Sequence, residues 1–82
     1  MKQFLLKSTI RKEPEGSGTK DFAVVMYMLN GKYVTHLYTP DNDACFSGNY
    51  FMEANESVKD FIERCEKWGV TTDFFNGHGF EK

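Results

Sequence analysis

The chain has 82 residues, of which 40% are hydrophobic and 16% aromatic, and its formal net charge at pH 7 is −2. This length allows a single domain with a modest core over residues 1–82, and the apolar content excludes a disordered chain. Two cysteines are too few for a disulfide-stapled scaffold, so we expect reduced thiols.

The first half of the chain is predicted to form three strands. Nearly alternating polar and apolar residues over positions 2–12 predict a strand with Phe4, Leu6 and Ile10 on one face. Positions 13–19 are rich in Gly, Pro and Ser, which predicts a flexible hairpin connection. Asn30-Gly31 then predicts a two-residue type I′ turn, because both central positions of that turn need positive φ.

This turn fixes the register of the central hairpin, whose strands we expect at 21–29 and 32–39. One face of the hairpin is predicted to carry the pairs Met28–Tyr33, Met26–Thr35, Val24–Leu37 and Phe22–Thr39. The other face is predicted to carry Leu29–Lys32, Tyr27–Val34, Val25–His36 and Ala23–Tyr38.

The segment from Thr39 to Phe51 holds two aspartates, a cysteine and a glycine, and so invites comparison with a calcium loop. Counted from Asp41, however, the fifth position of that template is Cys45 and the twelfth is Met52, neither of which supplies the required oxygen ligand. Proline and aspartate at 40–43 are typical of a turn, and a turn is our interpretation.

The second half of the chain is predicted to contain a short strand at 49–53 and one helix at 56–68. Asn55 is placed to cap the helix and Gly69 to end it. An apolar stripe at helical spacing would face the sheet: Val58, Phe61, Ile62, Cys65 and Trp68. The tail at 71–82 forms either an edge strand or irregular chain.

These elements predict an α+β fold, with a three- to four-stranded antiparallel sheet and one amphipathic helix packed on one face. A single helix leaves the second face of the sheet uncovered. That face would show Leu5, Val25, Tyr27, Leu29, Val34 and Tyr38, bordered by Lys7, Arg11, Lys32 and His36. Contiguous apolar patches on a folded protein usually mark an interface, although the C-terminal tail offers an alternative cover for this one.

No arrangement of residues points to catalysis, a cofactor or a metal. A Cys45 nucleophile would need His36 or His78 as its base, and the sequence supplies the residue types without a group to orient them. A zinc site built from Cys45, Cys65, His36 and His78 lacks the close ligand spacing of such sites. We expect no enzyme activity.

The leading hypothesis is a non-catalytic protein-binding module that docks on another protein or on a second copy of itself. Its partner-binding residues would be Tyr27, Val34, His36 and Tyr38, with Val25, Lys7, Arg11 and Lys32 around them. Such a small chain suits a bacteriophage or mobile-element accessory protein that inhibits a host enzyme or defence complex.

The alternative hypothesis is single-stranded RNA or DNA binding by the same face, with tyrosines stacking on bases. The charge distribution allows a local basic strip, because residues 1–40 carry six basic and three acidic side chains whereas residues 41–82 carry four and nine. No run of apolar residues approaches the roughly 20 needed to span a membrane, and none resembles a secretion signal. We therefore expect no membrane partner and a cytoplasmic location.

Overall fold

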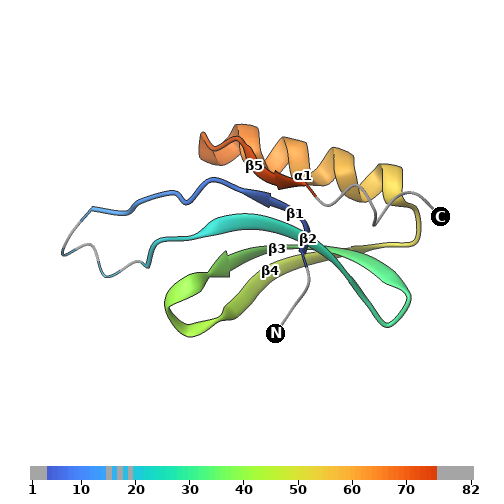
Figure 1. Cartoon of the computed structure of the whole chain (residues 1–82), viewed down its shortest axis with the longest axis horizontal. Coiled ribbons are helices and arrows are strands. Elements are labelled where there is room, and N and C mark those ends of the chain that lie inside the picture. Colours follow the sequence, from blue (N-terminus) through green and yellow to red (C-terminus); the bar gives the residue numbers. More distant parts are fainter. Residues whose placement is uncertain (1–3, 15, 17, 19, 76–82) are drawn as a thin grey trace.

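The computed structural model describes residues 4–14, 16, 18 and 20–75, which form one antiparallel sheet and one helix (Figure 1). The elements in chain order are β1 (Phe4–Ser8), β2 (Ala23–Leu29), β3 (Lys32–Thr39), the short 3₁₀ turn η1 (Pro40–Asn42), β4 (Ala44–Phe51), α1 (Ala54–Trp68) and β5 (Thr72–Phe75). The strand order is β4-β3-β2-β1-β5, and α1 crosses one face of the sheet before the chain reaches β5. The predicted α+β class is confirmed, but the sheet has five strands rather than three or four.

The additional strand is β5, which pairs antiparallel with β1 and forms one edge of the sheet. The sequence left the tail open between an edge strand and irregular chain, and residues 72–75 take the first form. The remainder of that prediction, over 76–82, lies outside the described residues. The opposite edge is β4, which begins at Ala44 and so is longer than the predicted strand at 49–53.

The predicted register of the central hairpin is confirmed for all seven pairs from Ala23–Tyr38 to Leu29–Lys32. Asn30 and Gly31 have φ values of 52° and 78°, as a type I′ turn requires. The predicted eighth pair is wrong, because Phe22 forms an isolated bridge with Arg11 instead of pairing with Thr39.

Strand β1 departs from simple alternation. Phe4 pairs with Tyr27 and Leu6 pairs with Met26, so two steps along β1 match one step along β2. This β-bulge places Phe4 and Leu6 on opposite faces of the sheet, whereas the sequence pattern put them on the same face. Leu5 consequently joins the helix side of the core, not the opposite face as predicted.

The helix begins two residues before its predicted start. Its N-cap is Glu53, whose side chain makes no capping hydrogen bond, and Asn55 lies inside the first turn. The predicted end is confirmed, because Gly69 adopts a left-handed conformation (φ 70°) and its N–H bonds back to the carbonyls of the last turn.

Two apolar clusters flank the sheet. The larger lies between the sheet and α1 and contains Leu5, Leu6, Phe22, Val24, Met26, Leu37, Phe61 and Cys65. The smaller lies on the face that α1 does not cover, called the outer face below, and contains Val25, Tyr27 and Val34. One member of the predicted helix stripe, Ile62, is 49% exposed and contributes little to either cluster.

Candidate functional site

The outer face brings together the centre of the predicted binding surface, but most of that centre is buried. Val25 and Val34 are fully buried and Tyr27 is 5% exposed. Phe4, Tyr38 and Cys45 pack against them. The open apolar surface expected from the sequence is therefore much smaller than predicted, and a binding role for these three side chains stays a prediction.

The cover over this cluster comes from Phe4, which the bulge in β1 turns to the outer face. Its ring meets Tyr38 edge-on at 4.9 Å and Tyr27 edge-on at 5.9 Å, measured between ring centroids. Such edge-to-face pairs stabilise a cluster by about 0.5–1.5 kcal/mol beyond the area they bury. The bulge therefore converts half of the expected surface into a second small core.

A line of rings extends from this core toward the β4 edge. The Tyr27 hydroxyl and His36 Nδ1 share a hydrogen bond of 3.0 Å, and their rings stack at 5.7 Å. His36 in turn meets the edge of Tyr50 at 6.1 Å. Burial raises the pKa of Tyr27 to about 12, so its hydroxyl keeps its proton at physiological pH.

The part of the outer face that remains accessible is formed by Tyr50 and Leu29, which are 56% and 41% exposed. Tyr50 lies opposite Val34 across β3 and β4, and Leu29 lies opposite Lys32 at the hairpin end. Sequence reasoning did not select Tyr50 as a site residue. The signal was available, because the predicted strand at 49–53, paired antiparallel with 32–39, could have placed Tyr50 beside Val34.

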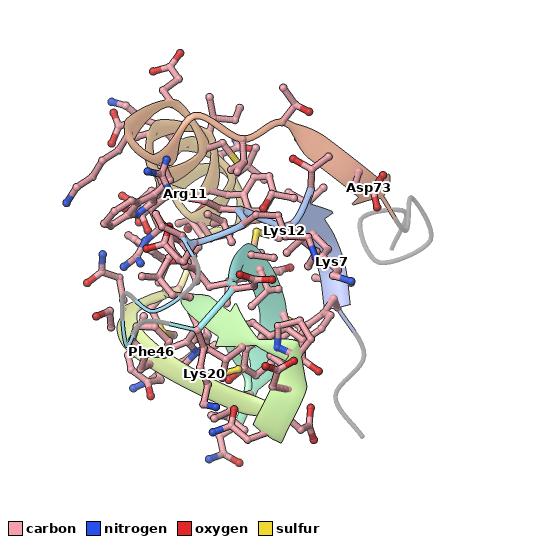
Figure 2. All side chains as sticks on the ribbon, turned by 90° about the vertical axis from the view of Figure 1, so that its left-hand side faces the viewer. Lys7, Arg11, Lys12, Lys20, Phe46 and Asp73 are labelled. Atoms are coloured by element: carbon pink, nitrogen blue, oxygen red, sulfur yellow. The ribbon has the colours of Figure 1, made fainter. Side chains whose placement is uncertain are left out.

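The predicted basic border is only partly assembled. Lys7 pairs with Val25 and so lies on the outer face, and Lys32 is exposed at the hairpin end. Arg11 does not join them. Its Nη1 donates to the Trp68 carbonyl at 2.5 Å, its guanidinium lies over the Trp68 ring at 5.9 Å, and Figure 2 shows it beside α1 and well apart from Lys7.

The helix side of the sheet carries a shallow groove between α1 and β4. Two cavities of about 350 and 470 Å³ share Leu37 and Trp68 as lining residues. At one end the Asp60 carboxylate accepts hydrogen bonds from the Thr35 hydroxyl and, at 3.0 Å, from Arg64 Nε. Burial alone would raise the pKa of Asp60, but these two bonds and the Arg64 charge together hold it below its ordinary value. This network ties α1 to β3.

The two thiols of the described segments lie on opposite sides of the sheet: Cys45 packs against the outer cluster and Cys65 belongs to the cluster beneath α1. Nowhere in residues 4–14, 16, 18 and 20–75 do three His, Cys, Asp or Glu side chains gather closely enough to hold a metal ion. Burial raises the pKa of Cys65 to about 11, which keeps that thiol protonated. Among the same residues no helix has both the length and the apolar character for crossing a bilayer.

Comparisons of the chain with protein-family models, with curated proteins and with solved structures found no match.

Proposed function

We propose that the chain is a non-catalytic protein-binding module that recognises its partner through the outer face. The observation that carries this proposal is the exposure of Tyr50, which presents 56% of its surface although it stands on a strand face beside other rings. Tyrosine is enriched at the energetic centres of interfaces, because it buries a large apolar area and also offers a hydroxyl. Leu29 extends the apolar surface toward the hairpin end.

The buried residues act as the support of this surface. Tyr27 is bonded to His36, whose ring meets the edge of the exposed Tyr50. The ring of Tyr38 packs against Phe4, and its hydroxyl donates to Asp43 at 2.8 Å. A surface whose rotamers are already fixed loses less conformational entropy on binding. Val25 and Val34 contribute by filling the space beneath the rings, and Lys7 and Lys32 form a polar rim.

The biological setting in this proposal is an accessory protein of a bacteriophage or mobile element that inhibits a host enzyme or defence complex by occupying its surface. This part of the proposal rests on the small size of the chain and on its composition.

Single-stranded nucleic acid is the weaker alternative for the same face. Arg11 is engaged with the end of α1 and with Glu13, and Lys12 forms an ion pair with Asp21, so these two cations are not available together with Lys7. Phosphate contacts dominate affinity for nucleic acid, and two lysines supply few of them.

Comparative capture tests the proposal. Wild-type chain, Leu29→Asp and Ile62→Asp would be immobilised, and the captured host proteins would be quantified by mass spectrometry. Ile62 is 49% exposed on α1, so its variant is a control for the general effect of placing a charge on an exposed apolar site. We expect a set of proteins that wild type and Ile62→Asp retain and Leu29→Asp loses.

Equal capture by all three chains would contradict the outer face as the binding surface. A parallel titration with a labelled single-stranded oligonucleotide at low salt tests the nucleic-acid alternative, because low salt maximises the contribution of phosphate contacts to affinity. Binding there that Leu29→Asp or Lys32→Ala abolishes would replace the protein partner with nucleic acid.

A further inference from the structure

Strand β4 is an edge of the sheet with no charged residue. It runs from Ala44 to Phe51 with the sequence ACFSGNYF, and among the strands that the structure describes it pairs only with β3. Charged side chains and prolines are the usual means by which proteins keep an edge strand from pairing with another chain. β4 has neither, and it exposes one aromatic ring on each face, Phe46 at 44% and Tyr50 at 56%.

The one protective feature of this edge is a β-bulge at its centre. Leu37 pairs with Phe46 and Thr35 with Asn49, so His36 of β3 faces two residues, Ser47 and Gly48. Ser47 takes a positive φ of 55°. A bulge normally interrupts the two-residue period of an edge and so discourages an approaching strand.

The bulge divides β4 into two regular halves, and in each half the pairing with β3 shows which side chains lie on which face of the sheet. Residues paired across a sheet share a face, so the register with β3 assigns a face to each of the six positions of β4 outside the bulge. Ala44, Phe46, Asn49 and Phe51 stand on the helix side, and Cys45 and Tyr50 stand on the outer face.

We propose that a second copy of this chain docks on β4, with the two β4 strands antiparallel about a two-fold axis between Ser47 and Gly48. The residue numbers of each opposed pair then add up to 95. Ala44 faces Phe51 of the second copy, Cys45 faces Tyr50, and Phe46 faces Asn49. In this register every regular pair lies on one face of the sheet. The two bulges lie opposite each other at the axis, so each compensates the interruption that the other causes.

Registers shifted by one residue do not keep opposed residues on the same face of the sheet. A slip of one residue in either direction would set helix-side positions against outer-face positions, for example Phe46 against Tyr50, and a slip exchanges faces along the whole strand. Only the register that pairs Ala44 with Phe51 sets all six regular positions of β4 against a position of the same face, and it places the axis within the bulge.

The backbone directions agree with the same register. Leu29 and Lys32 close a two-residue hairpin and exchange both backbone hydrogen bonds, so alternate residues of β3 direct their N–H and C=O groups toward β2 and toward β4. The residues of β3 directed toward β4 are Tyr33, Thr35, Leu37 and Thr39, and their partners on β4 are Phe51, Asn49, Phe46 and Ala44. The backbone groups of Tyr50 and Cys45 consequently point away from β3, and these two positions face each other across the proposed axis.

The self-complementary facing of β4 favours a second copy over an unrelated strand, because each half of β4 meets the other half of its own copy and the two bulges coincide. β4 has no charged side chain, so this pairing brings no like charges of the two strands together. The resulting ten-stranded sheet would carry both helices on one side and would set Tyr50 of one copy beside Cys45 of the other on the outer face. This interface lies at the sheet edge and does not depend on the proposed binding by the outer face.

A single substitution tests the register. In Tyr50→Cys the introduced thiol should lie opposite the native Cys45 of the second copy, whereas within one chain the two positions are five residues apart along a strand, beyond disulfide reach. We expect mild oxidation to yield a covalent dimer, with the disulfide between positions 45 and 50 identified by mass spectrometry. Asn49→Cys is the matched control, because position 49 is exposed on the opposite face of the same strand.

The wild-type mass in solution, measured by light scattering over a wide concentration range, completes the experiment. A mass that rises to twice the chain mass, together with the 45–50 disulfide, supports the proposal. A wild-type chain that stays monomeric would overturn it and leave the edge to a strand of a different protein. Cross-linking of Tyr50→Cys no greater than that of Asn49→Cys would overturn the β4 pairing. Leu29→Asp should still dimerise, which separates this interface from the outer face.

Discussion

At the scale of single residues, Gly48 shows how the bulge in β4 and the outer face are connected. A Cβ atom at position 48 would overlap the imidazole of His36, whose Nδ1 is bonded to the Tyr27 hydroxyl. Gly48→Ala should therefore displace the His36 ring and strain the rings around it. We expect a loss of about 1–3 kcal/mol in the free energy of unfolding, measured by urea denaturation.

The same substitution in a His36→Ala background is the control, since removal of the ring creates the space that the methyl group needs. The loss caused by Gly48→Ala should fall to a small fraction of its value there. A loss of equal size in both backgrounds would contradict the steric explanation and point to a backbone requirement at position 48.

Asp60 provides the second prediction at this scale. Its folded pKa is held below its ordinary value by Thr35 and Arg64 against the opposing effect of burial, so its contribution is fully present above the unfolded pKa and is lost as the pH falls through the folded pKa. Asp60→Asn should cost about 1–2 kcal/mol of unfolding free energy at pH 7.

Urea denaturation of wild type and Asp60→Asn from pH 7 down to pH 2 would show this directly, because the two stabilities should converge as the carboxyl of the wild type becomes protonated. Asp73→Asn, at an exposed position on β5, controls for the loss of a negative charge. A difference between wild type and Asp60→Asn that stays constant down to pH 2 would mean that the ionised form of Asp60 does not stabilise the fold.

At the scale of elements, Arg11 joins the long connection after β1 to the end of α1. Its guanidinium donates to the Trp68 carbonyl, one of the carbonyls at a helix C-terminus that have no partner within the helix. Arg11→Ala should therefore lower the unfolding free energy by about 1 kcal/mol. Lys12→Ala is the matched control, because the ion pair of Lys12 with Asp21 is largely exposed and should contribute at most about 0.5 kcal/mol. Equal losses in the two variants would show that Arg11 does not secure the helix end.

The elements also show which parts of this fold could be predicted from the sequence. The register of β2 and β3 could be predicted because Asn30-Gly31 determines it locally. The bulge in β1 could not be predicted, since no residue near Leu5 marks it and it belongs to the pairing of β1 with β2. The start of α1 differs from the prediction because the Glu53 carbonyl already accepts a hydrogen bond from the Ser57 N–H, which places Asn55 inside the helix and not at its cap.

The candidate site also has a part that could be predicted from the sequence and a part that could not. Tyr27, Val34, His36 and Tyr38 could be grouped on one face, because their grouping follows from the hairpin register. Their burial could not be predicted, because the cover comes from Phe4, whose facing depends on the bulge. Arg11 was predicted to border the outer face because the alternating pattern over positions 2–12 was interpreted as one strand. Strand β1 ends at Ser8, three residues before Arg11.

At the scale of the whole molecule, the sheet is packed on both sides although one helix covers only one side. The bulge in β1 supplies the outer cluster with Phe4, and the bulge in β4 places Gly48 against His36. A chain of this length has a stability of about 5–10 kcal/mol, so even a three-residue cluster is a large part of it. The exposed side chains of Tyr50 and Leu29 on the outer face and the charge-free β4 edge are then surface that the fold itself does not use.

Two adjacent valines test this description of the molecule. Val24 and Val25 are both fully buried, but Val24 belongs to the cluster beneath α1 and Val25 to the outer cluster. Each Val→Ala substitution removes the same two methyl groups, so if both faces are packed core, each should lower the unfolding free energy by about 2–3 kcal/mol. Urea denaturation at low protein concentration measures this without a contribution from self-association. A loss for Val25→Ala below half of that for Val24→Ala would mean that water reaches the outer face, and would return Val25, Tyr27 and Val34 to the open binding surface that the sequence predicted.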